Sequence, residues 1–289
     1  MTEHIAFDDT AIADIASEGP TQTTAADIAY QRLLIVNVIF IGAPGTAKWV
    51  LVDAGVPGSA SFIKRAANER FGDFDRPVAI VMTHGHFDYA GALESLAADW
   101  EVPIYAHPLE LPYLDGTTAY PPPDPSVGGG MMSALSPLYP RGPYDVHRWL
   151  QPLPTDGTVP PLPGWRWIPV PGHTPGQIAL WRTADRSLIA GDAFITTDQE
   201  SAYAVALQKT EIQGPPMYFT TDWDAAHVSV HTLAALEPEL AVTGHGHAMH
   251  GPELRAGLHM LDEQFDLVAV PAHGRYVDDG GADGATANG

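Results

Sequence analysis

The sequence predicts an α/β fold in which paired sheets lie between two layers of helices. Short apolar, β-branched runs alternate with stretches in which apolar residues recur at helical spacing, and this alternation is typical of strands followed by helices. The chain has 289 residues, of which 45% are hydrophobic, so it can bury the core of one large domain. We therefore predict a four-layer αββα sandwich.

The first half of the chain reads as strands and helices in turn. Residues 33–41 and 49–52 are apolar runs on either side of a Gly-Ala-Pro-Gly turn, which indicates a β-hairpin. Apolar residues recur on one side of the segment 59–70, and we expect a helix there. A strand should follow over residues 78–83, with the next helix beginning near Tyr89.

The second half repeats this order. Strands resume at Trp165, and the runs 178–181 and 187–190 flank a polar turn. Asp222 suits the N-cap of a helix that ends at Leu236. Pro252 suits the first turn of a last helix, which should run to about Leu267.

We expect three segments of different character. Residues 1–26 are polar and acidic and should form a flexible N-terminal segment, residues 27–277 should form the folded domain, and the tail 278–289 should be disordered. Within the domain, residues 115–163 are rich in Pro and Gly but also carry apolar side chains. A connection of this length is usually functional or disordered, so we predict a flap along a substrate pocket, with a plain surface excursion as the alternative.

Composition limits the partners. The formal net charge of −21 would repel a phosphate backbone, which argues against nucleic acid. No stretch approaches the roughly 18 continuous apolar residues of a membrane span, and the N-terminus has no signal-peptide core, so we expect a cytoplasmic protein without a membrane partner. The absence of cysteine excludes a disulfide framework. A small-molecule substrate is the expected partner, and a homodimer is left open.

Histidines and aspartates gather directly after four apolar runs. The motifs are Thr83-His84-Gly85-His86-Phe87-Asp88, Pro171-Gly172-His173-Thr174, Gly191-Asp192-Ala193 and Gly244-His245-Gly246-His247, with Val52-Asp53-Ala54-Gly55 upstream. Side chains at the mouths of strands can converge on one point although they are remote in sequence. The candidate metal ligands are His84, His86, Asp88, His173, Asp192 and His245.

These motifs, in this order, resemble the metallo-β-lactamase superfamily, which includes zinc β-lactamases, glyoxalase II-type thioesterases and lactonases. The resemblance spans about Ile35 to Ala248 and implies that fold. It implies a first metal site at His84, His86 and His173, and a second one at Asp88 and His245, bridged by Asp192. Three imidazoles suit a zinc ion that keeps one position open for water. Two cations lower the pKa of a shared water towards about 7, so no Ser or Cys nucleophile is required.

Tyr89 departs from the pattern of the superfamily, in which Asp-His is the commonest ending of the first motif. The second site therefore lacks one imidazole, and three alternatives follow: two metals with fewer protein ligands, substitution by Tyr89 or His247, or a single metal. We place Asp88 and Tyr89 among the catalytic residues. One or two zinc ions are expected, with iron or manganese as alternatives, since a phenolate suits ferric iron better than zinc.

Other residues receive weaker roles. Asp53 should orient a ligand histidine through a hydrogen bond. Residues that could line the substrate pocket are His107, Met131, Tyr139 and Tyr203. The remaining histidines are expected at the surface or in packing roles, namely His147, His227, His231, His250, His259 and His273.

The predicted activity is hydrolysis by a metal-bound hydroxide that opens a lactone or related carboxylic ester. Thioester or β-lactam hydrolysis would use the same site, and the substrate would be selected by the pocket walls. A different class is an iron-dependent oxidation of a sulfur substrate, as in the persulfide dioxygenases of the superfamily, which use two His and one Asp on one iron. A non-catalytic binding module is a third alternative, disfavoured by the intact ligand motifs.

Overall fold

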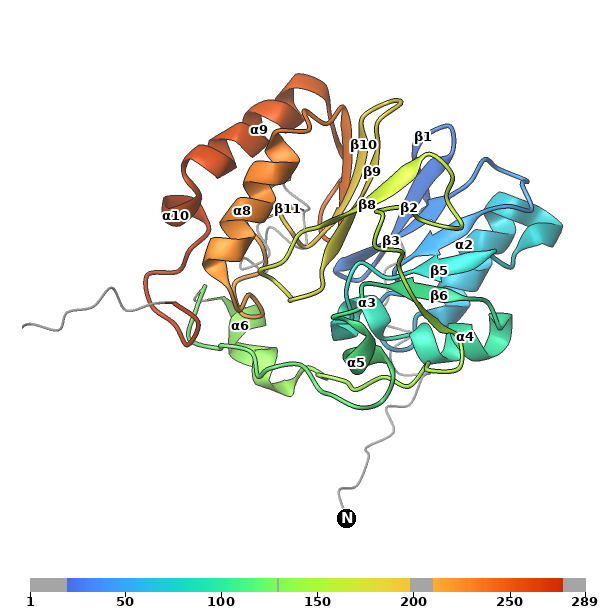
Figure 1. Ribbon diagram of the computed structural model, residues 1–289, viewed down its shortest axis with the longest axis horizontal. Coiled ribbons are helices and arrows are strands. Elements are labelled where there is room, and N and C mark those ends of the chain that lie inside the picture. Colours follow the sequence, from blue (N-terminus) through green and yellow to red (C-terminus); the bar gives the residue numbers. More distant parts are fainter. Residues whose placement is uncertain (1–19, 129, 198–209, 278–289) are drawn as a thin grey trace, which may run out of the picture.

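Two β-sheets pack face to face, and helices cover the outer face of each (Figure 1). The computed structural model describes residues 20–128, 130–197 and 210–277. The first half of the chain forms one sheet with its covering helices, and the second half forms the other sheet with its own helices. The predicted αββα sandwich is therefore confirmed.

The first sheet has seven strands in sequence order. Its strands are β1 (Gln22–Ala25), β2 (Ile28–Leu33), β3 (Val36–Ile41), β4 (Val50–Val52), β5 (Ala79–Val81), β6 (Ile104–Ala106) and β7 (Leu150–Pro152). Pairing is antiparallel from β1 to β4 and parallel from β4 to β7. Helices α2 (Ala60–Phe71) and α4 (Leu93–Trp100) pack on its outer face.

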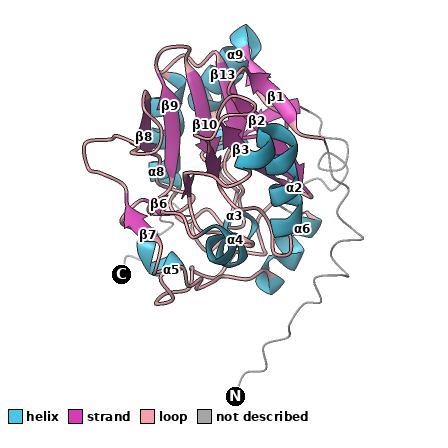
Figure 2. Cartoon of the chain, turned by 90° about the vertical axis from the view of Figure 1, so that its right-hand side faces the viewer, coloured by secondary structure: helices cyan, strands magenta, loops and turns pink. Residues whose placement is uncertain are grey.

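The second sheet has the order β14-β13-β10-β9-β8. Its strands are β8 (Trp165–Pro169), β9 (Ile178–Arg182), β10 (Ser187–Gly191), β13 (Leu240–Thr243) and β14 (Met249–His250). Figure 2 shows β8, β9, β10 and β13 running alongside one another. Helices α8 (Trp223–Ala234), α9 (Gly251–Glu263) and α10 (Phe265–Val268) cover its outer face.

Alternation along the strands separates three apolar layers. In β4, Leu51 packs with the helices α2 and α4, whereas Val50 and Val52 belong to the layer between the sheets. In β10, Leu188 packs with α8 and α9, whereas Ile189 faces the opposite sheet. Successive side chains of a strand point to opposite faces, and both faces are covered here, so these strands read as continuous apolar runs.

Short elements complete the connections. They are η1 (Gly72–Phe74), α3 (Phe87–Ala90), α5 (Leu111–Leu114), α6 (Met131–Leu135), η2 (Ser136–Leu138), β11 (Ile195–Thr197) and β12 (Thr210–Gln213). None of the helices in the described part of the chain is long and apolar enough to cross a membrane.

Two boundaries near the N-terminus differ from the prediction. The run 33–41 is not one strand, because the chain turns at Leu34, whose φ is +60°, and divides it between β2 and β3. The flexible segment does not extend to residue 26, since β1 pairs with β2. Residues 1–19 and the tail 278–289 lie outside the described residues.

The helix expected from Tyr89 onwards is divided into α3 and α4. A Cβ atom on Gly91 would lie 2.2 Å from the backbone nitrogen of Pro57, and the Gly91 N–H donates to the Gly55 carbonyl. This close approach of two backbones breaks the helix between Ala90 and Leu93. The last expected helix is likewise divided, at Gln264, into α9 and α10.

The segment 115–163 is packed against the domain, as its apolar content suggests. Val127, Met132 and Tyr139 form a cluster with Phe219 and neighbouring side chains of the loop before α8. The segment contains α6, η2 and β7, so it carries more regular structure than we expected.

Candidate metal centre

The ligand-bearing loops leave the sandwich at one end. β5 is followed by His84, β8 by His173, β10 by Asp192 and β13 by His245. β10 and β13 are parallel to each other. β8 runs in the same direction as β10, because β8 and β10 are each antiparallel to β9. The carboxyl ends of β8, β10 and β13 therefore lie at the same edge of the second sheet, where α/β proteins commonly bind their ligands. The end of β5 joins them there, since the Ile178 N–H donates to the Thr83 carbonyl at 3.0 Å.

Three histidines form the core of the site. His84, His86 and His173 are buried, and each offers a ligand atom within 4.8 Å of those of the other two. The Nδ1 atom of His86 lies 3.0 Å from the Nε2 atom of His173. Two ring nitrogens at this distance fit a shared cation.

Burial keeps these imidazoles neutral. Burial, together with His86, holds the pKa of His84 well below its usual range, and burial with His173 does the same to the pKa of His86. Burial also lowers the pKa of His173 to about 4, although Asp192 opposes the shift. Neutral imidazole is the form that binds a metal.

Hydrogen bonds fix which nitrogen of each ring carries the proton. Thr83 Oγ1 donates to Asp53 Oδ2, so it accepts from His84 Nδ1 at 3.2 Å. Thr220 Oγ1 donates to a carbonyl oxygen, so it accepts from His173 Nδ1 at 3.0 Å. Both Nε2 lone pairs are thus left for a ligand.

The Nε2 atom of His84 is buried and has no hydrogen-bond partner among the described residues. A buried polar atom without a partner is costly, and a bound cation would remove that cost. The donor set and this orphaned nitrogen therefore fit a divalent metal. Asp53 acts on His84 through Thr83, in line with the expected orienting role.

The acidic half of the site surrounds His245. Its Nε2 atom lies 3.4 Å from Asp88 Oδ2 and 3.5 Å from Asp192 Oδ2, while Nδ1 donates to the Ile35 carbonyl at 2.7 Å. Burial alone would lower the pKa of His245, but the two carboxylates outweigh it and raise that pKa to about 10. A cation bound here would replace this proton between the same three side chains.

Asp192 links the two halves. Its Oδ2 atom lies 3.4 Å from His173 Nε2, 3.9 Å from His84 Nε2 and 3.5 Å from His245 Nε2. Burial opposes ionisation, but His245 and then His173 and His84 hold the pKa of Asp192 well below its usual range. The carboxylate is therefore anionic and lies within 3.9 Å of three candidate histidine ligands.

Tyr89 is directed at Asp192. It is fully buried, its hydroxyl donates to Asp192 Oδ1, and its ring lies 4.1 Å from that of His84. A Cβ atom at Gly244 would lie 1.6 Å from the Tyr89 hydroxyl, so only glycine leaves room for the phenol. Burial and the charges of Asp192 and Asp88 hold the pKa of Tyr89 well above its usual range, so it is a neutral donor.

This contact changes the expected role of Asp192. We expected each carboxylate oxygen to bind one metal, but Oδ1 accepts the Tyr89 proton and Oδ2 alone faces the histidines. His247, the other expected substitute ligand, has its Nδ1 atom 3.3 Å from the Tyr30 hydroxyl and is outside the three-histidine group.

Four neighbours of the ligands were not identified from the sequence. They are Thr83, Glu110, Tyr120 and Thr220. Thr83 is next to a ligand and could have been inspected for that reason. Nothing in the local sequence marks the other three, because their contacts join segments far apart in the chain.

The expected pocket residues lie in different surroundings. Tyr139 stacks on Phe87 with 4.8 Å between ring centres, and Phe219 stacks on His86 at 4.5 Å. Met131 is 57% exposed, and His107 packs against Trp167. Tyr203 lies outside the described residues.

The histidines assigned to surface or packing roles are outside the three-histidine group. His231 Nδ1 lies 2.9 Å from Asp262 Oδ2, and His259 Nε2 lies 2.5 Å from Glu237 Oε1. His227 stacks on Phe265 and His147 pairs with Asp145. His250 and His273 are exposed.

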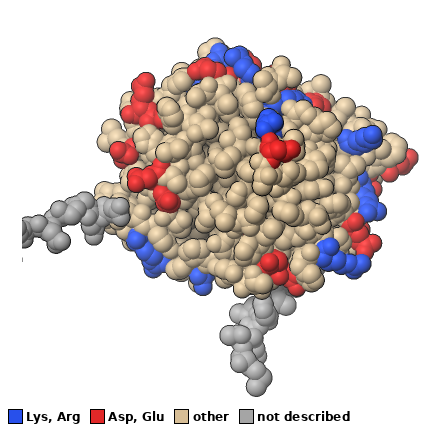
Figure 3. Space-filling model, in the orientation of Figure 1, with Lys and Arg blue, Asp and Glu red and all other residues tan. Residues whose placement is uncertain are grey.

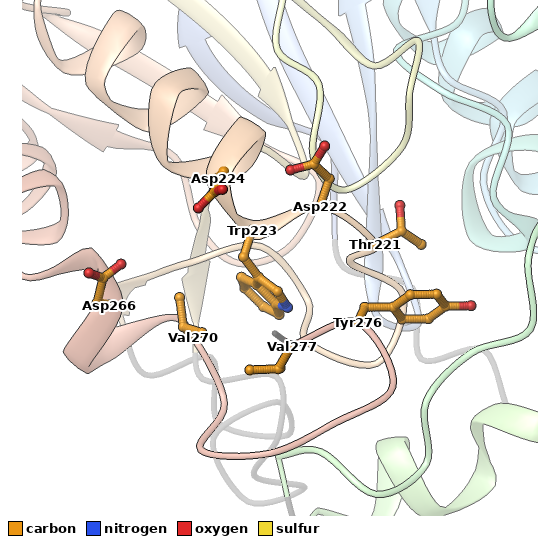
Figure 4. A pocket seen from close by; sticks show the side chains of 8 residues that line it. All are labelled: Thr221, Asp222, Trp223, Asp224, Asp266, Val270, Tyr276 and Val277. Carbon is orange, nitrogen blue, oxygen red and sulfur yellow. The ribbon is translucent and has the colours of Figure 1, made fainter. Parts of the chain in front are cut away.

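A cavity of about 350 Å³ is lined by Trp223, Tyr276 and neighbouring side chains, among them the aspartates Asp222, Asp224 and Asp266 (Figure 4). One of these, Asp222, accepts from the Ala225 N–H and caps α8 as predicted. None of the metal-ligand candidates lines this cavity. Asp222 and Asp224 belong to the start of α8, whereas Asp266 lies in α10.

Comparison with known proteins identifies the family. The family model of the metallo-beta-lactamase superfamily matches residues 32–245. The chain belongs to this superfamily. It is 48% identical over 235 residues to "Probable metallo-hydrolase YflN" of Bacillus subtilis (strain 168), covering 81% of this chain and 89% of that protein. It is 28% identical over 196 residues to "Probable metallo-hydrolase YybB" of the same organism, covering 68% and 74%.

Solved structures of the superfamily share the fold. A B3 metallo-beta-lactamase with an active-site glutamic acid is 17% identical, with a TM-score of 0.57 over 85% of this chain and 88% of that one. TTHA1623 in a di-iron-bound form is 24% identical, with a TM-score of 0.51 over 75% and 90%. Within the superfamily, the chain is a metallo-hydrolase with a three-histidine metal site.

Replacing a ligand should separate the site from the surface histidines. We expect His84→Ala or His173→Ala to lose the tightly bound metal, because two imidazoles cannot hold it as three do. His231→Ala is the matched control, since its side chain is 70% exposed and its ion pair with Asp262 contributes about 0–1 kcal/mol. Metal content after dialysis and circular dichroism measure both effects. Equal metal loss in His231→Ala would contradict the assignment.

Tyr89 should control occupancy of the second site. We expect wild-type protein to retain one metal tightly and to bind a second only when free metal is added to the buffer. The reason is that the site around Asp88 and His245 has one imidazole fewer than is usual in the superfamily. Tyr89→His should raise retention of the second metal, and elemental analysis after dialysis measures it.

Tyr89→Phe is the control, because it removes the hydroxyl without adding a ligand. It should not restore the second metal to the level of Tyr89→His. If wild type already holds two metals as firmly as Tyr89→His, another residue replaces the missing histidine.

Proposed function

We propose that this metallo-hydrolase opens a lactone or a related carboxylic ester, with zinc at His84, His86 and His173. The observation that carries the proposal is the set of three neutral, buried imidazoles whose lone pairs meet. Such a set suits zinc with one open position. When bound, the cation supplies a hydroxide nucleophile at neutral pH and polarises the carbonyl group under attack.

Asp88 and Asp192 would have different roles in the reaction, one in proton transfer and the other in charge balance. Water adds its oxygen to the carbonyl carbon, the ester C–O bond breaks, and the leaving oxygen takes a proton. Asp88, whose Oδ2 atom lies 3.4 Å from His245 Nε2, would accept the water proton and return it to the leaving oxygen. Asp192 remains anionic and balances the positive charge.

Tyr89 would position Asp192 rather than contact substrate. Its hydroxyl donates to Asp192 Oδ1, and its ring is fully buried between the ligand loops. We expected a catalytic role for Tyr89, and the geometry supports an indirect one: the phenol orients the carboxylate oxygen that faces the histidines.

Aromatic side chains would form the pocket wall. Phe219 stacks on His86 and Tyr139 stacks on Phe87, which directly follows His86. These rings join the segment 115–163 to the loop before α8. An apolar wall beside the metal suits the acyl or ring portion of a neutral ester better than a phosphate ester.

The surface charge supports a small-molecule substrate. On the face shown in Figure 3, Lys and Arg side chains are scattered among Asp and Glu side chains and form no continuous basic surface. With a net charge of −21, nucleic acid remains an unfavourable partner. A cytoplasmic location and a homodimer stay predictions from the sequence.

Metal removal should abolish activity and lower thermal stability. Anything that binds only the folded state stabilises it, by about 2.7 kcal/mol when its concentration is 100 times its Kd. Chelator followed by thermal melting, with and without added zinc, measures the shift. Full activity in chelator together with an unchanged Tm would rule out the metal centre.

A substrate panel should identify the reaction. We expect zinc-loaded protein to hydrolyse lactones or simple carboxylic esters faster than thioesters or β-lactams, as measured by kcat/KM on one preparation. Elemental analysis of the purified protein is the companion measurement. Iron in place of zinc, with oxygen uptake on a persulfide and no ester hydrolysis, would favour the dioxygenase alternative.

A further inference from the structure

A buried carboxylate outside the ligand set joins the two loops that carry the three histidines. Glu110 is fully buried at the start of α5. Its Oε1 atom accepts from Thr174 Oγ1 at 2.8 Å and from the Gly176 N–H at 2.9 Å. Its Oε2 atom accepts from the Gly85 N–H at 3.1 Å and from the Tyr120 hydroxyl. One oxygen therefore holds each ligand loop.

Both loops are shaped to admit this carboxylate. A Cβ atom on Gly176 would lie 2.8 Å from Glu110 Cγ, and one on Gly85 would lie 2.9 Å from the Tyr120 hydroxyl. Gly85 stands between His84 and His86, and Gly176 follows His173 by three residues. The glycines of both ligand motifs thus lie where Glu110 and Tyr120 approach the backbone.

Tyr120 adds a contact with a ligand ring. Its hydroxyl accepts from the Gly85 N–H at 2.8 Å while donating to Glu110. Its ring lies 4.5 Å from that of His86 and stacks on Tyr113 at 3.8 Å. Tyr120 belongs to the segment 115–163, so this segment reaches the metal loop as well as the aromatic wall.

Holding a carboxylate inside the protein is costly unless its oxygens are fully hydrogen-bonded. No cation pairs with Glu110 in the described chain, and its partners are two backbone N–H groups and two hydroxyls. An apolar side chain could fill the same space, but it could not bind both loops. The arrangement therefore suits a role in setting the distance between them.

We propose that Glu110 and Tyr120 are positioning residues that fix the separation of the His84–His86 loop from the His173 loop and thereby set metal affinity and geometry. This proposal rests on the metal centre at those three histidines. Hydrogen-bonded neighbours of metal ligands commonly change affinity by about 10- to 100-fold when they are replaced.

Glu110→Gln is the decisive variant. It keeps the length of the side chain but places an NH₂ group where one oxygen stood. Hydroxyls of Tyr120 and Thr174 can rotate to accept from it, but the N–H groups of Gly85 and Gly176 cannot. With the NH₂ group at the Oε1 position, the Gly176 N–H loses its acceptor and faces a second donor. With the NH₂ group at the Oε2 position, the Gly85 N–H keeps the Tyr120 hydroxyl but loses Glu110 and faces a second donor.

Asp124→Asn is the matched control. Asp124 is also a buried carboxylate that joins two segments, with Oδ1 accepting from Ser126 and Oδ2 from the Arg275 N–H. The hydrogen bonds of the Asp124 side chain within the described residues go to Ser126 and Arg275 and not to the histidine loops, so its variant should cost stability while leaving metal binding intact.

The measurements are zinc affinity by chelator competition, the visible spectrum of the cobalt-substituted protein, and thermal melting of the metal-free form. We expect Glu110→Gln to weaken zinc binding about 10- to 100-fold and to change the cobalt spectrum. Asp124→Asn should keep the affinity and spectrum of the wild type at a comparable loss of Tm.

Tyr120→Phe provides the test if Glu110→Gln does not fold, because it removes only one hydroxyl. It should weaken zinc binding several-fold, about as expected for one lost hydrogen bond near the site. Zinc affinity and cobalt spectra unchanged from wild type in the folded variants would overturn the proposal. Wild-type protein that binds no metal would instead overturn the proposed function.

Discussion

The site depends on fixed protonation of its histidine rings. His84 and His173 each give Nδ1–H to a threonine hydroxyl, and His245 gives it to a backbone carbonyl. Because each proton is held on the outer side of the ring, the Nε2 lone pairs of His84 and His173 point inward to where Asp192 Oδ2 lies. The Nε2 atom of His245 faces the same oxygen. Thr83 and Thr220 donate their hydroxyl protons to other acceptors, so each can only accept from its histidine. A change of tautomer in His84 or His173 would therefore break the hydrogen bond to the threonine.

Tyr89 shows how one substitution changes the symmetry of such a site. Burial and the neighbouring carboxylates keep the Tyr89 phenol protonated, and a neutral phenol is a poor metal ligand. It occupies the space beside Gly244 and holds Asp192 Oδ1. The three-histidine half therefore keeps all of its nitrogen ligands. In the half around Asp88 and His245, no described side chain replaces the imidazole that is missing at position 89.

The sequence pointed to the candidate ligands, which the structure brings together, but not to the residues that support them. His84, His173 and Asp192 follow apolar runs directly, so their place at strand ends is a local property that alternation and motif spacing reveal. Glu110 meets Gly85 and Gly176 from 25 and 66 residues away. Such contacts depend on how strands β5, β6 and β8 are arranged, and no local pattern records that arrangement.

The segment 115–163 contacts both the loop of His84 and His86 and the aromatic side chains beside it. We expected only a pocket wall there, and Tyr139 beside Phe87 is consistent with one. Tyr120, from the same segment, hydrogen-bonds the backbone between His84 and His86. A shift of this segment would therefore move the apolar wall and disturb a ligand loop together. Substitutions in the segment that displace Tyr120 should therefore lower metal affinity as well as alter substrate preference. Substitutions confined to the exposed face of α6 around Met131 should leave metal affinity unchanged.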